Sequence, residues 1–280
     1  MRMLYAAFVK NGVVSMAAFQ ETFADPDLWP LLLETVAVTG VSSVVAMVIA
    51  TVFAWLNERT DASMGWASRL LPLVPLMLPP IALSTGWFFL GHERAGLLNV
   101  GLRALTGALG LDWWAETGPV NIATFSGLIF VYTLYLVPFA YLLVAAAFRN
   151  FDSSLEEASR VAGAGSWRTF RNVSAPGIMP ALAAAVFLVA VTALSNFSIP
   201  VIIGTVSRID VLSVRIVRLV RDAYPARIDE AIILSLFVVL AVGLLFWLQR
   251  RISARQRHVT IGGKGVYASK IPLGPWKWVA

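Results

Sequence analysis

The sequence predicts an all-α, polytopic membrane protein with five transmembrane helices. Of its 280 residues, 58% are hydrophobic and 14% are charged, whereas a soluble domain carries about 25% charged residues. With so few charged residues, most of the protein surface is expected to face an environment other than water. Five segments reach the length of about 20 apolar residues that a membrane span requires. They are residues 31–55, 70–90, 120–148, 177–203 and 231–249.

Charged side chains are almost absent from these segments. The second to fifth contain none, and the first contains only Glu34, in its first turn. An ionised side chain at the bilayer centre costs at least about 2.5 kcal/mol, so this exclusion indicates a lipid environment. A soluble helical core would instead show polar faces at a 3.6-residue period. Tryptophans, which favour the headgroup layer, lie near the ends of spans one, two and five: Trp29, Trp55, Trp66, Trp87 and Trp247.

The second span contains four prolines, Pro72, Pro75, Pro79 and Pro80. Proline removes a backbone donor and clashes with the preceding turn of a helix. Membrane helices tolerate such breaks where neighbouring groups satisfy the freed carbonyls. The span is therefore predicted to be kinked or broken, either as a packing kink or as a hinge that lines a pathway.

The distribution of Lys and Arg predicts the orientation, because these residues favour cytoplasmic loops. Thirteen of the 22 lie between spans one and two, between spans three and four, or after span five. The other nine lie on the opposite side, five of them in residues 204–230. The loop between spans three and four is thus predicted to be cytoplasmic. Residues 1–30 are predicted to be extracytoplasmic, and residues 31–258 to form one transmembrane domain.

The loop between spans three and four has the features of a short helix. Ser153 and Ser154 each precede a glutamate by three residues, at Glu156 and Glu157, which predicts a capping box at the helix start. Glu156 and Arg160 have the acid-first, four-residue spacing of a stabilising pair. One face of this helix is apolar and consists of Leu155, Ala158, Val161 and Ala162.

A second short helix is predicted to follow the first. Gly163 and Gly165 are suited to end the first helix, and Ser166 to cap a second one over residues 167–173. Pro176 disfavours helical geometry in the residue before it, so the second helix is predicted to stop there. The pattern indicates a helix–glycine–helix unit between two spans.

This loop resembles the EAA motif of binding-protein-dependent ABC importer permeases, which reads E-A-A, three residues, G, nine residues and I-x-L-P. Glu157, Ala158 and Ser159 stand at E-A-A, Gly163 stands at the glycine, and residues 173–176 stand at I-x-L-P. The departures, Ser for Ala at 159, Val for Ile at 173 and Ala for Leu at 175, are small or apolar exchanges. The resemblance covers about residues 30–280 and implies the fold of a type I ABC importer permease.

The resemblance implies that the loop is a coupling helix, which docks on a separate ATP-binding subunit and transmits ATP-driven closure to the spans. The implied coupling residues are Glu156, Glu157, Ala158, Ser159, Arg160, Gly163, Ala164, Val173 and Pro176. The chain lacks the G-x-x-x-x-G-K-[ST] phosphate-binding segment, so ATP hydrolysis would belong to the partner. The residues alone leave open an amphipathic helix that rests on lipid headgroups.

The resemblance also implies a periplasmic solute-binding protein and a second permease half or subunit, without a cofactor. Residues 196–200, 208–220 and 259–280 are similar to the first half of fused ferric-iron-type permeases. Residues 259–280 are therefore expected to be a cytoplasmic linker toward a second half. Permeases for polyamines, thiamine or phosphonates share much of the pattern, so these cargoes stay open.

Polar side chains at the end of span four form a candidate translocation pathway. They are Thr192, Ser195, Asn196 and Ser198. The alternative is interhelical hydrogen bonding, which is worth about 0.6 kcal/mol per pair in measured membrane cases. The two interpretations are equally compatible with the sequence.

An amphipathic helix with an arginine stripe is predicted over residues 211–224. Arg215, Arg218 and Arg221 recur at three-residue spacing. On the extracytoplasmic side they would meet acidic lobes of a solute-binding protein, or else anchor on anionic headgroups.

Several function classes are disfavoured. The absence of cysteine excludes disulfides, thiolate metal sites and a cysteine nucleophile. His92 and His258 lie far apart in the sequence, so no metal site or catalytic residue is predicted. The net charge of +6 is not assigned to nucleic-acid binding, because no basic run alternates with aromatics on a soluble module. A membrane-embedded enzyme would need acids, bases or metal ligands in the spans. A non-transporting membrane scaffold stays open, and association with an ATPase would distinguish it.

Overall fold

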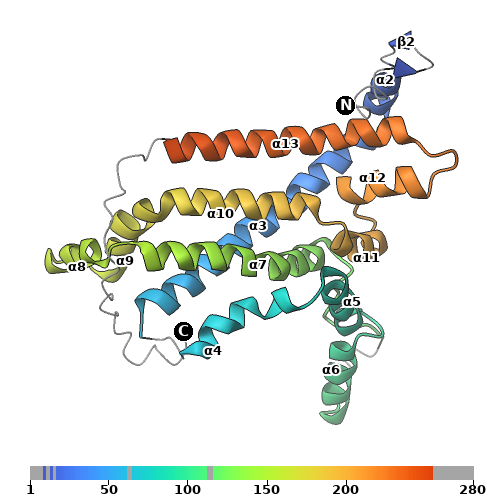
Figure 1. The fold of residues 1–280 in the computed structure, drawn as a ribbon. Helices are drawn as coiled ribbons and strands as arrows, with labels where there is room; N and C mark the ends of the chain where they lie inside the picture. Colours follow the sequence, from blue (N-terminus) through green and yellow to red (C-terminus); the bar gives the residue numbers. More distant parts are fainter. Residues whose placement is uncertain (1–8, 11–12, 15–16, 62–64, 112–115, 255–280) are drawn as a thin grey trace. The chain divides into compact units, whose positions relative to one another are not determined.

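The computed structural model describes residues 9–10, 13–14, 17–61, 65–111 and 116–254, and nearly all of them are helical (Figure 1). A short antiparallel pair, β1 (Val9–Lys10) and β2 (Val13–Val14), precedes α2 (Ala17–Ala24). The predicted linker over residues 259–280 lies outside the described residues.

In the part of the chain that the structure describes, four helical stretches are long and apolar enough to cross a membrane. They are α3 (Leu28–Arg59), α7 (Phe125–Asn150), the stretch Ser166–Ser195, which ends in α10 (Ala175–Ser195), and α13 (Ile228–Ala254). They correspond to the predicted spans one, three, four and five. The second predicted span brings the number to five if its two parts are counted as one span. The all-α membrane fold is therefore confirmed.

The second span is broken at its prolines, as the sequence predicts. α4 (Trp66–Leu70) continues into the 3-10 helix η1 (Leu71–Met77), and α5 (Pro80–Gly91) starts after the break. Pro80 occupies the first turn of α5, where its missing N–H costs no intrahelical bond. A further helix that the sequence interpretation did not include, α6 (Leu97–Ala108), follows α5.

The fourth predicted span differs from the single helix expected up to Ile203. Helix α10 ends at Ser195, and a separate helix, α11 (Ser198–Ser207), follows it. The side chain of Asn196 explains the break, because its Oδ1 accepts the backbone N–H of Ile199 at 3.0 Å in the first turn of α11. The backbone carbonyl of Asn196, which lies outside both helices, accepts hydrogen bonds from the hydroxyl groups of Tyr132 at 3.2 Å and Ser213 at 2.9 Å. Tertiary hydrogen bonds thus interrupt an otherwise apolar helix.

The chain divides into two compact units. One consists of the described residues up to Ser42 with residues 78–132 and 192–243, and the other of residues 43–77, 133–191 and the described residues from 244. In the first unit, α12 (Leu212–Arg221) begins where the Leu212 N–H donates to Thr35 Oγ1 of α3 at 2.9 Å. An apolar cluster holds α12 against the first turns of α3 and α13: Leu28, Leu31, Leu212, Leu219, Ala231 and Leu234.

Candidate functional site

The loop between α7 and α10 lies in the second unit and consists of three helical pieces. They are α8 (Ser153–Val161), α9 (Ser166–Thr169) and a π-helical turn, η2 (Phe170–Ser174). The predicted helix–glycine–helix pattern is therefore confirmed. The predicted stop before Pro176 is wrong, because η2 runs directly into α10 and residues 166–195 form one continuous helix. A π turn is a local adjustment that accommodates a proline in a helix, so the loop joins the fourth span without a flexible joint.

Helix α8 starts at Asp152, not at a Ser–Glu capping box. The Oδ1 of Asp152 accepts the backbone N–H of Ser154 at 2.9 Å, which satisfies one of the free donors at the helix start. This hydrogen bond lowers the pKa of the Asp152 carboxyl. A lowered pKa means that the cap stabilises the loop at neutral pH and loses this effect only as the pH falls through the lowered value.

Gly163 ends α8 in a Schellman turn. Its N–H donates to the Arg160 carbonyl at 2.9 Å, and the Ala164 N–H donates to the Ser159 carbonyl at 3.1 Å. The φ angle of Gly163 is +86°, and no neighbouring atom lies within 4 Å of the position of a Cβ. Glycine is therefore required here by the left-handed backbone and not by crowding. Gly165, in contrast, has a φ of −67°, which any residue adopts.

Helix α8 is amphipathic, but its apolar face is exposed and part of its polar face is buried. Its apolar side chains point outward: Leu155 and Ala158 are exposed, and Val161 is 90% exposed. Its polar residues Ser153 and Glu156 are buried. Exposed apolar surface is unfavourable by about 25 cal/mol per Å² in water, so this orientation indicates that another surface covers α8.

The remaining predicted coupling residues are divided between the surface and the interior. Glu157 is exposed beside Ala158, and Pro176 is also exposed. Ala164 and Val173 are half-buried. The Ser159 hydroxyl of α8 is hydrogen-bonded to the Thr169 hydroxyl of α9 at 3.1 Å, which connects the two helices. Trp167 of α9 adds to the outer surface of the loop an indole ring that is 71% exposed.

The predicted pairing of Glu156 with Arg160 is wrong. Arg160 Nε donates at 3.4 Å to the backbone carbonyl of Glu156, while the Glu156 carboxylate turns into the interior. There it lies 2.9 Å from Nε of Arg59, the last residue of α3. The Ser174 hydroxyl of η2 donates to the same carboxylate at 2.6 Å. A buried tertiary ion pair has replaced the exposed local one.

Arg59 also binds the C-terminal end of α7. Its Nη2 donates to the carbonyls of Phe148 at 2.7 Å and Phe151 at 3.3 Å. The side chains of Arg59 and Glu156 are only 6% and 5% exposed. We call Arg59, Glu156 and Ser174 the buried node. Sequence reasoning missed Arg59 and Ser174, because a single arginine after a span resembles any cytoplasmic flanking charge.

A series of aromatic contacts starts at the buried node. The Arg59 guanidinium lies 5.6 Å from the ring centroid of Phe148, in the range of a cation–π contact. Phe170 of η2 stacks on Phe148 with centroids 6.5 Å apart and contacts Trp55 at 6.1 Å and Trp167 at 5.6 Å. Phe148 and Phe170 thus connect Arg59 to the exposed indole of α9.

The predicted pathway residues have different environments in the first unit. Asn196 is buried and holds the start of α11, as described above. Ser195 is exposed, whereas Thr192 and Ser198 are half-buried. The structure thus assigns a structural contact to Asn196.

The arginine stripe falls on α12, which confirms the predicted helix. Arg215 pairs with Asp25 at 3.2 Å, and Arg218 pairs with Asp210 at 2.8 Å. Arg221 is exposed. Two of the three arginines are therefore engaged within the chain.

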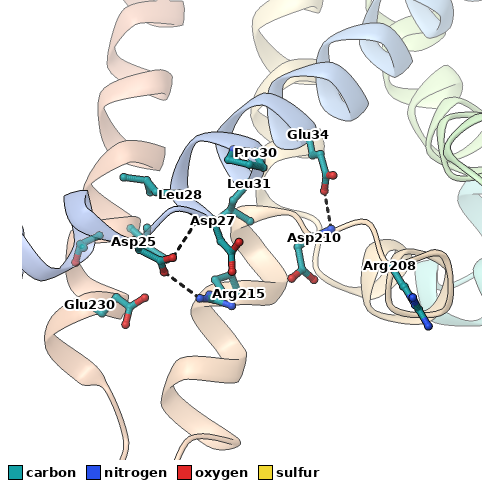
Figure 2. Close-up of a pocket in the computed structure, with 12 residues that line it drawn as sticks. Asp25, Asp27, Leu28, Pro30, Leu31, Glu34, Arg208, Asp210, Arg215 and Glu230 are labelled. Atoms are coloured by element: carbon teal, nitrogen blue, oxygen red, sulfur yellow. Dashed lines mark hydrogen bonds and ion pairs between the residues drawn. The ribbon is translucent and has the colours of Figure 1, made fainter.

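A pocket of about 220 Å³ lies next to these arginines, with Asp25 directed toward Arg215 (Figure 2). Most of its carboxylates have internal partners. Asp25 accepts the Asp27 N–H at 2.9 Å, and Glu34 accepts the Asp210 N–H at 2.8 Å. These bonds fix the turns before α3 and α12. In the described part of the chain, no group of three or more acidic or histidine side chains is arranged to hold a metal ion.

Comparison with known sequences identifies relatives of this chain. The ferric transport system permease protein FbpB of Actinobacillus pleuropneumoniae is 23% identical over 227 residues, which cover 81% of this chain and 31% of that protein. The sulfoquinovosyl glycerol transport system permease protein SmoG of Agrobacterium fabrum (strain C58 / ATCC 33970) is 28% identical over 209 residues, which cover 71% of this chain and 65% of that protein. The chain thus spans about a third of the length of the ferric relative.

The fold is similar to that of a solved bacterial ABC transporter involved in the import of the acidic polysaccharide alginate. The TM-score is 0.70 at 17% identity, and the match covers 91% of this chain and 89% of that chain. Independently, residues 42–258 match the family described as the binding-protein-dependent transport system inner membrane component. This match includes the loop of α8 and α9 and covers most of the chain. The chain therefore belongs to the family of binding-protein-dependent transport system inner membrane components.

Proposed function

We propose that this chain is the membrane-spanning permease subunit, or half, of an ATP-driven importer, and that α8 and α9 form the surface on which an ATP-binding subunit docks. The observation that carries the proposal is the inverted orientation of α8, with Val161 and Ala158 outward and Glu156 buried. Family membership supports the class of partner. A solute-binding protein and a second half or subunit complete the proposed importer.

The outward face of α8 favours a protein partner over lipid headgroups, whereas α9 and η2 expose Arg168 and Arg171. The α8 face presents the carboxylate of Glu157 beside Val161 and Ala158, and anionic headgroups attract Lys and Arg, not carboxylates. Arg160, the basic residue of α8, is half-buried and directed to the Glu156 carbonyl. An apolar face with one exposed acid fits a groove that contains a basic or hydrogen-bonding group.

Glu157→Lys and Gly163→Asp are each expected to reduce co-purification of the ATP-binding subunit at least about tenfold, as expected for the loss of an interface hot spot. The first reverses the charge of the docking face, and the second places a side chain where φ is +86°. The measurement is the ratio of the two subunits after detergent extraction.

Gly165→Ala is the matched control, because its backbone is extended and its surroundings are open. It is expected to retain the wild-type ratio. Normal association of both the Glu157→Lys and the Gly163→Asp proteins would show that the loop has no coupling role and would favour a non-transporting scaffold.

For the cargo, we propose ferric iron, supported by the ferric transport relative, which matches 81% of the chain. A glycoside cargo is the second candidate, because the sulfoquinovosyl glycerol relative has the higher identity, 28% against 23%. Deletion of the gene is expected to reduce uptake of radioactive ferric iron and to leave sugar uptake unchanged. The reverse result would assign the chain to the second class.

A further inference from the structure

The buried node connects four segments of the second unit through one ion pair. Arg59 ends α3, its guanidinium binds the carbonyls at the end of α7, Glu156 belongs to α8, and Ser174 lies in η2 before α10. We propose that Arg59, Glu156 and Ser174 are positioning residues that make the loop of α8 and α9 move as one body with the ends of α3 and α7. The inference rests on the proposed docking function of this loop.

The geometry makes Arg59 the connecting side chain. Its planar guanidinium presents donors in several fixed directions. Nε binds the Glu156 carboxylate at 2.9 Å, while Nη2 binds the Phe148 carbonyl at 2.7 Å. Carbonyls at a helix C-terminus carry partial negative charge and favour a cation. One cation therefore holds two negative groups of different segments, and neither segment can shift without breaking a short, charged hydrogen bond.

Glu156 transfers this constraint to the docking face. It lies one residue before Glu157 and two before Ala158, on the opposite side of α8, so the position of its carboxylate sets the rotation of the outward face about the helix axis. Ser174 binds the same carboxylate from η2, which continues without a break into α10. Thus the node orients α8 relative to the end of α3 and the start of the fourth span.

A merely stabilising role is a poor explanation for this arrangement. Replacing a buried ion pair by apolar residues of similar size is often neutral or stabilising, so stability alone does not require charges here. Apolar contacts are not directional, so they allow packed segments to slide and rotate, whereas charged hydrogen bonds hold the segments in one relative orientation. This difference separates positioning from stability in an experiment.

The test uses the double variant Arg59→Met/Glu156→Leu, which removes both charges and keeps the apolar volume. The chain contains no cysteine, so Val52→Cys, at an exposed position of α3, accepts a single environment-sensitive fluorophore. The labelled permease is assembled with its ATP-binding subunit in nanodiscs and treated with MgATP and vanadate. We expect normal association and thermal stability in the double variant, with the nucleotide-induced change in fluorescence reduced at least about fivefold, the lower end of measured coupling factors.

Three further variants complete the experiment. Arg149→Gln weakens the neighbouring pair with Glu58, in which the arginine is 51% and the glutamate 8% exposed, and is expected to respond like the wild type. Arg59→Lys keeps the positive charge but loses the planar set of guanidinium donors, and it is expected to give an intermediate response. Ser174→Ala removes one of the donors to Glu156 and is likewise expected to give an intermediate response.

A wild-type fluorescence change in the stable double variant would overturn the positioning role. Loss of subunit association in that variant would also overturn it, because the node would then shape the docking face instead of transmitting its motion. Failure of the docking proposal is separate, since it would appear as normal association of both the Glu157→Lys and the Gly163→Asp proteins.

Discussion

Glu156→Ala is expected to lower the free energy of unfolding by about 3–5 kcal/mol, the range for removing one partner of a buried ion pair. The change leaves the guanidinium of Arg59 buried without its counter-ion and the Ser174 hydroxyl without its acceptor, which lies 2.6 Å away in the native protein. Both groups then keep the cost of desolvation without the compensating bond. The measurement is reversible unfolding of the chain in detergent micelles, followed by tryptophan fluorescence.

Two variants show whether burial is the cause of this loss. Arg149→Gln weakens a neighbouring ion pair of 3.4 Å between a half-exposed arginine and Glu58, whose side chain is 8% exposed. It is expected to cost less, about 1–2 kcal/mol, because the glutamine amide can still donate to the carboxylate. The double variant Arg59→Met/Glu156→Leu is expected to recover most of the loss, because no unpaired charge stays buried. Equal costs for Glu156→Ala and Arg149→Gln would contradict the burial of the node.

Gly127→Ala is expected to cost about 1–3 kcal/mol, the range for overpacking a tightly packed site. A Cβ at this position of α7 would lie 2.6 Å from the Ile122 Cα and 2.7 Å from its carbonyl carbon. These are backbone atoms, which have no rotamer to change. The Ile122 N–H also donates to the Gly91 carbonyl at 2.9 Å, so the obstructing segment is itself held to the end of α5.

Gly243→Ala in α13 is the matched control for this prediction. Gly243 is also helical, but it is exposed and no atom lies within 4 Å of its Cβ position. Alanine favours helix over glycine by about 1 kcal/mol, so this variant is expected to unfold at the same or a higher denaturant concentration. A loss equal to that of Gly127→Ala would show that close approach to Ile122 is not the cause.

The sequence by itself determined the features that depend on local chemistry. Charge exclusion over about 20 residues locates a membrane helix, because the bilayer penalises each ionised group separately. The four prolines of the second span predicted that it is kinked or broken, and the structure puts the break before Pro80. Gly163 and Gly165 predicted the end of α8, and the structure selects Gly163. In each case the cause lies in the backbone or side chains of the segment itself.

The tertiary structure alone decided the features that depend on distant partners. The Glu156 carboxylate had two local choices, a capping box and Arg160, and instead binds Arg59, 97 residues earlier in the chain. Asn196 divides an apolar segment because Tyr132 and Ser213 satisfy its freed carbonyl. Arg215 likewise turns from the stripe toward Asp25.

The physical reason is the different cost of a polar group in the two settings. On the surface, a local pair contributes only a few tenths of a kcal/mol, whereas a buried carboxylate without partners costs several. Folding therefore selects the distant partner, and spacing along the sequence contains no record of it. The same choice turns the apolar face of α8 outward, and this is the feature on which the proposed docking surface rests.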